Sequence, residues 1–401
     1  MLLIHQQVTA APVVTVDVWV GAGAAVEPEP WSGMAHFLEH MIFKGTDRLQ
    51  PGQFDQIIEN RGGVTNAATS HDYAHFYIST ATTDFPETLP HFADLLLNAA
   101  IPDGEFDLER DVVLEEIRQS FDDPDGLGFQ VLMETLYPHH AYGRPVLGEA
   151  EKLLERSPQE MRWFHRAHYQ PENMTVVVVG DISWQQTIEQ VSQAFSTFPQ
   201  RADCPRPARI PQLGMSEIRR QTLELPRLGV ARLMLGWTAP GVDQIGTAYG
   251  LDLLSALLAG GRTARLVREL REERQLVQEI GSGFTLQRDS SLFTITAWLE
   301  VEHLAQVEAI IGDRISELAV TPIDPLEMRR CQRLLCNDFA FSTETASQLA
   351  GLYGYYSTIA QPELAVAYPN VIANLQPDTL QHVAAQYLSP LRYAAVELLP
   401  V

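Results

Sequence analysis

The chain has 401 residues, of which 45% are hydrophobic and 20% charged, so it is long enough for two globular domains of about 200 residues each. Its 51 acidic and 28 basic residues give a net charge of −23, which argues against nucleic acid as a partner because like charges repel. Such acidity is typical either of a protein that attracts cationic partners or of one that uses charge only for solubility.

The cysteines and the N-terminal segment bear on the compartment. Cys204, Cys331 and Cys336 form no C-x-x-C pair and no disulfide framework, which suits a reducing environment. The first twenty residues lack a basic segment followed by a continuous apolar core, and no later apolar run is long enough to span a bilayer. We therefore expect a cytoplasmic protein without a membrane span. A signal sequence removed from a precursor would leave no trace here.

The first half of the chain mixes expected strands and helices. Expected strands are rich in β-branched and aromatic residues, and expected helices show apolar residues at helical spacing. The strands are expected at Val13–Val20, at Val64–Thr80 as one or two strands, and at Met174–Val179. The helices are expected at Ser32–Gly45, Phe54–Asn60, Phe85–Ala99, Glu105–Ser120 and Pro158–His168.

A proline-rich stretch ends this half. Arg201–Leu213 contains Pro205, Pro207 and Pro211, with Pro199 just before it, and such a stretch favours a linker. We therefore predict one domain over residues 1–204 and a second over residues 212–401.

The second half repeats the order of the first. Strands are expected at Ala231–Trp237, Phe284–Leu299 and Tyr393–Leu398, and helices at Gly250–Ala259, Val301–Leu318, Pro325–Phe341 and Gln348–Ala360. Self-similarity of this kind indicates a structural duplication.

The helix expected at Ser32–Gly45, SGMAHFLEHMIFKG, carries the most informative polar residues. Ser32 is a good N-cap and Gly45 fits the left-handed position that closes a helix. The segment between them is apolar all round except for His36, Glu39 and His40, where the two histidines lie one turn apart on one face. Burying two imidazoles and a carboxylate costs several kcal/mol unless something satisfies them, and a divalent metal would do so. No counterpart of HFLEH occurs in the second half, so we expect the chemistry in the first.

A zinc site of this kind needs a third ligand, usually a carboxylate in zinc peptidases. In DLERDVVLEEIRQS, Glu109, Val112, Val113 and Glu116 fall on one helical face, so the two carboxylates share a face with two valines that should be buried. Taken alone, this helix is also compatible with a solvated acidic face.

HFLEH, with Glu116 75 residues further on and another glutamate seven residues before it, closely resembles the inverted zinc motif of the pitrilysin-type metallopeptidases. This family includes insulin-degrading enzyme and the mitochondrial processing peptidase. The resemblance extends through most of the chain, in the segments GGVTNAATSHDYAHFY, HAYGRPVLGEAEKL, HYQPENMTVVVVGDIS and GGRTARLVRELREER.

The resemblance implies a fold and a set of site residues. The fold is two homologous α+β domains, each a mostly antiparallel sheet with helices packed on one face, which together make half of a clamshell. By position, the implied roles are zinc ligands for His36, His40 and Glu116, general base for Glu39, and supporting acid behind the ligands for Glu109. Asn66 and Ala67 match the edge strand on which an extended substrate lies.

The resemblance also implies a zinc endopeptidase that hydrolyses extended or unfolded peptides in a dimeric chamber. In the family, an arginine and a tyrosine seven residues later hold the substrate; here Arg271 matches the arginine, but Gln278 replaces the tyrosine. We therefore expect a heterodimer with a homologous subunit that lacks zinc, or alternatively a homodimer. Two other functions stay open: a non-catalytic structural or chaperone-like subunit similar to respiratory-complex core proteins, and a zinc hydrolase acting on non-peptide substrates.

Overall fold

The computed structural model describes residues 1–205, 214–226 and 228–401. It divides into two compact units, each built from three separate stretches of the chain. The first contains Met1–Gln119, Arg144–Arg209 and Ser342–Ala365, and the second contains Ser120–Gly143, Ile210–Phe341 and Val366–Val401. The predicted boundary between residues 204 and 212 falls largely on 206–213, which lie outside the described residues, so it stays a prediction.

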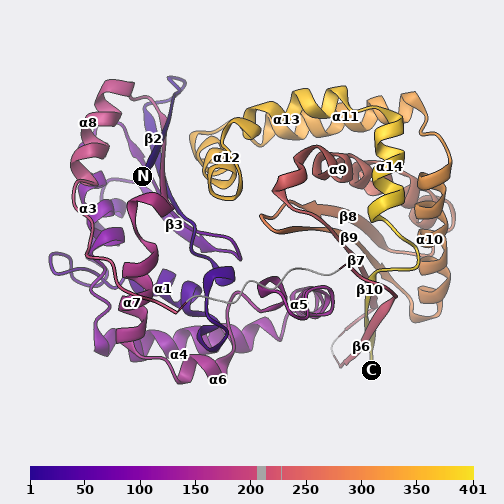
Figure 1. Cartoon of the computed structure of the whole chain (residues 1–401), viewed down its shortest axis with the longest axis horizontal. Helices are drawn as coiled ribbons and strands as arrows, with labels where there is room; N and C mark the ends of the chain where they lie inside the picture. The colour runs from indigo at the N-terminus through magenta and orange to yellow at the C-terminus, as the bar shows by residue number, and fades with distance from the viewer. Residues whose placement is uncertain (206–213, 227) are drawn as a thin grey trace. The chain divides into compact units, whose positions relative to one another are not determined.

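Among the described residues, the first unit contains one five-stranded sheet, around which its helices are arranged (Figure 1). Its strands, in spatial order, are β1 (Leu2–Gln7), β5 (Met174–Gly180), β2 (Val13–Val20), β4 (Ala74–Ala81) and β3 (Val64–Thr69). β1 and β5 are parallel, and every other neighbouring pair is antiparallel. β3 therefore forms one edge of the sheet and pairs with β4. These two strands occupy the segment Val64–Thr80, where one or two strands were expected.

One face of this sheet packs against a layer of helices. Alternate residues along the strands, such as Val16, Val18 and Phe76, are fully buried in one core with the helices, as the period of two in a strand requires. The first half of the sequence contributes these helices to the unit: α1 (Met34–Ile42), α2 (Gln53–Glu59), α3 (Phe85–Leu97), α4 (Asp103–Ser120), α6 (Ala150–Leu154), α7 (Pro158–His168) and α8 (Trp184–Ala194).

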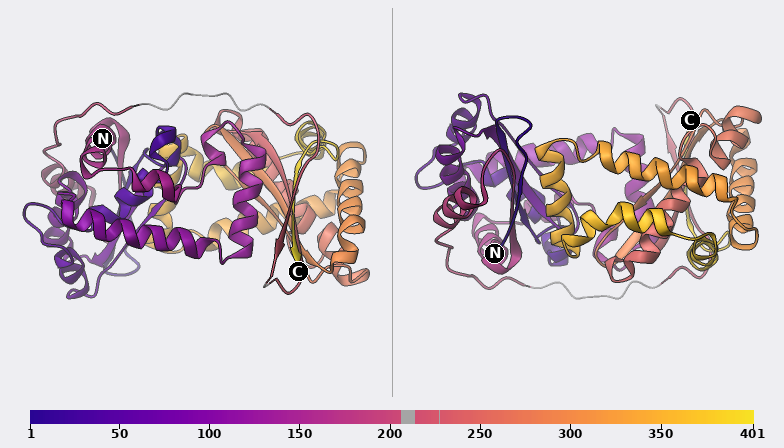
Figure 2. Two further views of the ribbon diagram at one scale, coloured as in Figure 1. Left: turned by 90° about the horizontal axis from the view of Figure 1, so that it is seen from below. Right: turned by 90° about the horizontal axis from the view of Figure 1, so that it is seen from above.

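The opposite face of the first sheet is covered by α12 (Ala346–Ile359), which comes from the second half of the sequence (Figure 2). Trp19 and Val177, whose side chains point away from the helical layer, are buried against Ala350 of this helix. Tyr353 of α12 also donates a hydrogen bond to Gln6 at 2.5 Å.

The second unit repeats this sheet with the same strand order. Its strands are β6 (Arg219–Leu225), β10 (Ala394–Pro400), β7 (Ala231–Pro240), β9 (Ser290–Leu299) and β8 (Glu279–Thr285). β6 and β10 are parallel, and the remaining pairs are antiparallel, as in the first unit. The predicted duplication is therefore confirmed. The segment Phe284–Leu299, expected to be strand like Val64–Thr80, contains the end of β8 and the whole of β9.

The helices of the second unit also divide between the two faces of its sheet. On one face α9 (Ile245–Ala259) and its neighbours share a core with Leu233 and Leu235. On the other face α5 (Pro124–Leu136), from the first half of the sequence, packs so closely that a side chain on Gly236 would meet Leu132 and Leu136. The remaining helices are α10 (Leu304–Val320), α11 (Pro325–Phe341), α13 (Glu363–Asn374) and α14 (Pro377–Tyr387).

These observations confirm the predicted α+β class with two related, mostly antiparallel sheets. The predicted fold had helices on one face of each sheet. In the structure the other face is also covered, by α12 in the first unit and by α5 in the second. Short 3₁₀ turns occur at Ala24–Val26, Glu29–Trp31, Ala141–Gly143, Pro171–Asn173, Val242–Gln244 and Val301–His303, and a π-helix at Val267–Glu273. Among the described helices, none combines the length and the hydropathy needed to cross a bilayer.

The packing of α12 on the first sheet gives a testable prediction. A Cβ added at Gly354 would lie 2.0 Å from Nε1 of the buried Trp19, whereas one added at Gly351 on the same helix would meet none of the described residues within 4 Å. We expect Gly354→Ala to lower the free energy of unfolding by about 1–3 kcal/mol through overpacking. Gly351→Ala should instead raise it by up to about 1 kcal/mol, because alanine favours helix more than glycine does. Denaturant unfolding of both variants measures the difference, and equal effects would contradict this packing.

Candidate zinc site

Helix α1 is buried on nearly every side and carries both histidines of the HFLEH segment. Its apolar residues Phe37, Leu38 and Met41 are fully buried in the core of the first unit. His36 is only 7% exposed, and its ring lies 4.8 Å from that of His40, one helical turn further on. The i, i+4 spacing therefore places both imidazoles on one face, as the sequence predicted.

The ends of α1 differ in part from the prediction. Gly45 has a φ of +97°, the left-handed conformation expected for it. The helix begins at Met34, however, and Gly33 with a φ of 93° takes the N-cap position that we assigned to Ser32. The Ser32 hydroxyl is buried and has no hydrogen-bond partner among the described residues, so it does not cap the helix.

Helix α4 presents the two glutamates that the sequence placed on one face. Glu109 is 9% exposed, Glu116 is half-buried, and Val113 between them is fully buried. Val112 is 51% exposed, so the prediction that both valines are buried is wrong. The buried face of α4 consists of Phe106, Glu109, Val113, Leu114 and Ile117, and Glu116 lies at its border.

Three potential ligand atoms converge between α1 and α4. Glu116 Oε2 lies 3.7 Å from Nε2 of His36 and 3.4 Å from Nε2 of His40, and the three donor atoms lie within 4.8 Å of one another. Tetrahedral zinc with bonds of about 2.0–2.2 Å needs ligand atoms roughly 3.3–3.6 Å apart. The two distances to Glu116 are close to this spacing. The 4.8 Å limit that covers the third separation is wider, so binding of a zinc ion with a fourth position for water would draw the ligand atoms together.

The carboxylate of Glu109 lies behind this cluster. Its Oε1 is 2.9 Å from Nδ1 of His40, and its Oε2 is 2.5 Å from Nζ of Lys44. When the Nδ1–H group of His40 donates a hydrogen bond to Glu109, Nε2 carries no proton and its lone pair faces the cluster. Glu109 thus orients a histidine rather than occupying a ligand position itself.

His36 is in the protonation state that a metal requires. Burial, followed by the nearby His40, lowers the pKa of His36 to about 4, so its imidazole is neutral near neutral pH. Only the neutral imidazole offers a lone pair to a metal ion.

Glu39 lies beside the cluster and contacts the edge strand. Its Oε2 accepts a hydrogen bond of 2.6 Å from the hydroxyl of Thr69, at the end of β3. Burial raises the pKa of Glu39, while this hydrogen bond and the neighbouring His40 act in the opposite direction. Thr69 is a site residue that the sequence analysis missed, although the alternation along β3 could have placed it on the same face as Ala67.

Among the described residues, no strand pairs with the outer side of the candidate substrate strand β3. Ser70 donates its backbone N–H to Tyr73 O, so in this antiparallel ladder residues 64, 66 and 68 bond to β4, and the N–H and C=O groups of 65, 67 and 69 face the free edge. The Ala67 N–H is held by the side-chain oxygen of Asn66 at 2.9 Å.

The remaining predicted substrate residue, Arg271, belongs to the second compact unit. It lies on the π-helix Val267–Glu273, where it donates two hydrogen bonds to Oε1 of Glu272. Gln278, which replaces the expected tyrosine, is exposed and donates its backbone N–H to Trp298. The first unit therefore joins His36, His40, Glu116, Glu109 and Glu39 in one cluster, whereas Arg271 belongs to the second unit.

Comparisons with known proteins identify the family. The sequence profile described as Insulinase (Peptidase family M16) matches residues 2–150, and the profile described as Peptidase M16 inactive domain matches residues 157–335. The chain belongs to peptidase family M16. The inactive-domain match covers most of the second half, in agreement with the absence of an HFLEH counterpart there.

Similar proteins and structures agree with this assignment. The zinc protease PqqE of Helicobacter pylori is 28% identical over 97% of this chain and 88% of its own length. An uncharacterized zinc protease of Mycobacterium tuberculosis is 28% identical over 96% of this chain and 88% of its own. The crystal structure of a protease from Helicobacter pylori has a TM-score of 0.92 at 27% identity and covers 99% of this chain and 96% of that one. Pitrilysin shares the fold, with a TM-score of 0.82 at 20% identity over 43% of its chain.

The family and the donor cluster together give the enzyme class. This M16 chain is a zinc protease whose cofactor is zinc, and its substrates are peptides. The residues present fit the ion in charge, donor type and spacing.

The contact between Glu109 and His40 gives a second prediction. Glu109→Gln keeps the size of the side chain but removes the negative charge that holds His40 and Lys44. We expect zinc affinity to fall about 10–100-fold with the fold retained, the usual cost of losing a partner behind a metal ligand. Competition with a chelator measures the affinity. Glu115→Gln, an exposed change on the same helix, is the control, and equal affinities in the two variants would contradict the role of Glu109.

Proposed function

We propose that this protein is a zinc-dependent endopeptidase that hydrolyses extended or unfolded peptides, with zinc ligands His36, His40 and Glu116 and with Glu39 as general base. The observation that carries the proposal is the placement of Glu39 between the three converging donor atoms and the free edge strand β3. A ligand cluster alone would support any zinc hydrolase. The adjacent edge strand favours a peptide.

The proposed chemistry assigns a task to each residue. Zinc, when bound, polarises the scissile carbonyl and lowers the pKa of a water ligand to about 7. Glu39 takes a proton from the attacking water and delivers it to the leaving amide nitrogen, a task that its raised pKa and partly buried position favour. Thr69 holds the carboxylate of Glu39 toward β3 through its hydroxyl.

Substrate binding is proposed to occur by addition of a strand to β3. The outward N–H and C=O groups of Ala67 would pair with an extended peptide backbone, after Asn66 gives up its contact with the Ala67 N–H. Pairing of this kind reads backbone rather than side chains, so it favours unfolded peptides over any single sequence. The net charge of −23 further favours cationic peptides at low salt.

The proposal is tested by Glu39→Gln. The amide keeps the shape of the side chain and can still accept the bond from Thr69, but it cannot take a proton, so hydrolysis of a mixed peptide library should fall at least about 10²-fold with zinc content unchanged. His40→Ala is the matched variant that should lose zinc as well. Unchanged turnover in Glu39→Gln would remove Glu39 from the mechanism, and a wild-type chain that binds zinc but cleaves no peptide, alone or with a partner, would favour the non-catalytic alternative.

A second subunit is proposed to complete the chamber. We favour a heterodimer with a homologous subunit that lacks zinc, because an amide at Gln278 lacks the reach and the acidic hydroxyl of tyrosine. A homodimer is the alternative, since glutamine can still donate a hydrogen bond. Peptide hydrolysis by the isolated chain should then be low and rise when the partner is added.

Gln278→Tyr provides the matching variant for this prediction. It should partly restore the activity of the isolated chain if that chain self-associates, whereas Gln278→Ala should not. Activity and molar mass are measured together against the subunit ratio. A stable homodimer with high activity that does not respond to changes at Arg271 or Gln278 would contradict the heterodimer.

A cytoplasmic location is also proposed. Cys204, Cys331 and Cys336 are all free thiols in the described structure, and Cys331 is fully buried. This use of cysteine suits a reducing compartment.

A further inference from the structure

Glu27 is a buried carboxylate whose role is left open by the proposed reaction. It has no exposed surface, lies nine residues before His36 and belongs to neither α1 nor α4. Burial raises the pKa of Glu27 to about 8, although its backbone hydrogen bonds and Arg144 act in the opposite direction. Burying a carboxylate is costly, so its partners indicate what it does.

The partners of the Glu27 side chain are the first N–H groups of the zinc-binding helix. Oε2 accepts the N–H of Gly33 at 3.0 Å, and Oε1 accepts the N–H of Ala35 at 2.7 Å. Gly33 has no side chain with which to cap the helix, so Glu27 takes over that role from a distance in sequence. Ala35 directly precedes His36, so this contact fixes the turn that carries a ligand.

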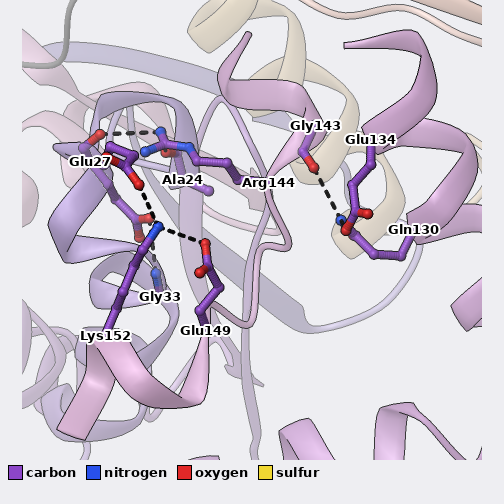
Figure 3. A network of polar contacts seen from close by, with 10 residues as sticks. Ala24, Glu27, Gly33, Gln130, Glu134, Gly143, Arg144, Glu149 and Lys152 are labelled. Carbon is purple, nitrogen blue, oxygen red and sulfur yellow. Dashed lines mark hydrogen bonds and ion pairs between the residues drawn. The ribbon is translucent and has the colours of Figure 1, made fainter. Parts of the chain in front are cut away.

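Arg144 holds Glu27 from the other side (Figure 3). One of its terminal nitrogens donates to the backbone oxygens of Ala24 at 3.0 Å and of Glu27 at 3.2 Å. A Cβ added at Gly33 would lie 2.8 Å from the Cα of Gly148, so the segment that follows Arg144 also lies directly against the start of α1. Residues 144–148, the RPVLG part of a motif whose role the sequence left unassigned, therefore lie against the N-terminus of the zinc-binding helix.

The same residues connect this helix to the hairpin that contains β3. The backbone N–H groups of Ala24 and Ala25 donate to the oxygens of Ser70 and His71, in the turn between β3 and β4. His71 in addition contacts the backbone oxygen of Arg144 through Nε2 at 3.1 Å. Helix α1 is thus tied to the β3 hairpin at its first turn through residues 24–27, and at its centre through Glu39 and Thr69.

We propose that Glu27, held by Arg144, is a positioning residue that sets the place of the first turn of α1, and with it His36, relative to Glu116 and the substrate strand. The inference deepens the proposed function and rests on it. A shift of this turn would move His36 more than His40, which Glu109 fixes independently. Loss of Glu27 should therefore weaken zinc binding and slow the chemical step, while leaving β3 free to bind peptide.

The test compares variants at two neighbouring glutamates. In Glu27→Gln the amide nitrogen faces one of the two backbone N–H groups, so one bond is lost with the shape retained. Glu27→Ala loses both bonds. The matched control is Glu29→Gln, the same change two residues on, at a side chain that is 74% exposed and pairs with Lys152. Zinc affinity is measured by competition with a chelator, and kcat and KM are measured at saturating zinc, well below the unfolding temperature of each folded variant.

We expect zinc to bind about 10-fold more weakly in Glu27→Ala, with a smaller loss in Glu27→Gln and none in Glu29→Gln. At saturating zinc, kcat should fall in the same order with KM unchanged. If Glu27→Ala does not fold, the isosteric Glu27→Gln decides the question. A purely structural role would lower the unfolding temperature of Glu27→Gln but leave its zinc affinity and kcat at the wild-type values, which would overturn the inference.

Arg144→Met provides an independent check. It removes the donor to Ala24 and Glu27, so it should weaken zinc binding in the same direction, and the effect of combining it with Glu27→Gln should be less than additive because the two residues act together. Additive effects would contradict a joint role. If the wild-type chain binds no zinc, the proposed function itself is wrong. Measuring zinc binding by the wild-type chain first therefore separates that outcome from a failure of the present inference.

Discussion

The burial of α1 is the constraint on which the rest of the first unit depends. A nine-residue helix that is apolar on nearly all sides also carries two imidazoles and a carboxylate, and each polar group must find a partner within the fold. Three of these demands are met by protein: the N-terminal N–H groups by Glu27, Glu39 by Thr69, and Nδ1 of His40 by Glu109. The Nε2 atoms of His36 and His40 lie near Glu116, where a bound cation would satisfy all three groups. The positions of α4, β3 and the segment after Arg144 follow from these contacts.

The exchange of helices between the halves of the sequence determines which part of the first sheet stays accessible. Helix α12 packs on β2 and β5, at the centre of the sheet, and leaves the outer strand uncovered. Along β3 the side chains of Val64, Asn66 and Ala68 on that face are exposed. An uncovered edge strand can pair with the backbone of another chain, and most proteins have features that prevent such pairing. Its retention beside Glu39 is consistent with the proposed use of β3 for substrate.

The sequence predicted those parts of the site that depend on local periodicity. The i, i+4 histidines and the seven-residue spacing of Glu109 and Glu116 each follow from helix geometry, and the structure places all four together. Val112 was assigned wrongly because the buried face of α4 is turned toward Leu114 and Ile117, and a helical repeat does not reveal how a helix is rotated against its neighbours.

Partners distant in sequence were not predictable in this way. Glu27 caps α1 from outside the helix, with Arg144 more than 100 residues further on, and no local pattern links them. The wrong assignment of the cap to Ser32 has the same origin, since serine is the better local candidate but its hydroxyl is not used. Helix α5 was not predicted, and α12 was predicted as a helix but not as a cover for the first sheet, because the sheet that a helix packs on is a property of the chain's path.

The duplication supplies an internal comparison that bears on the metal. Helix α9 is the counterpart of α1 in the second unit and is also largely buried. Its polar residues are paired by protein, with Ser255 bonded to Ser282 on β8 and Asp252 accepting the hydroxyl of Tyr368. In α1 the equivalent surroundings contain two imidazole nitrogens and a carboxylate oxygen that face one another within 4.8 Å, and all three present lone pairs when His36 and His40 are neutral. Lone pairs so arranged repel each other unless a metal ion or a proton lies between them, and α9, without histidines, has no such arrangement to satisfy. The two histidines of α1 are therefore better accounted for by the proposed zinc ion than by the packing of the fold.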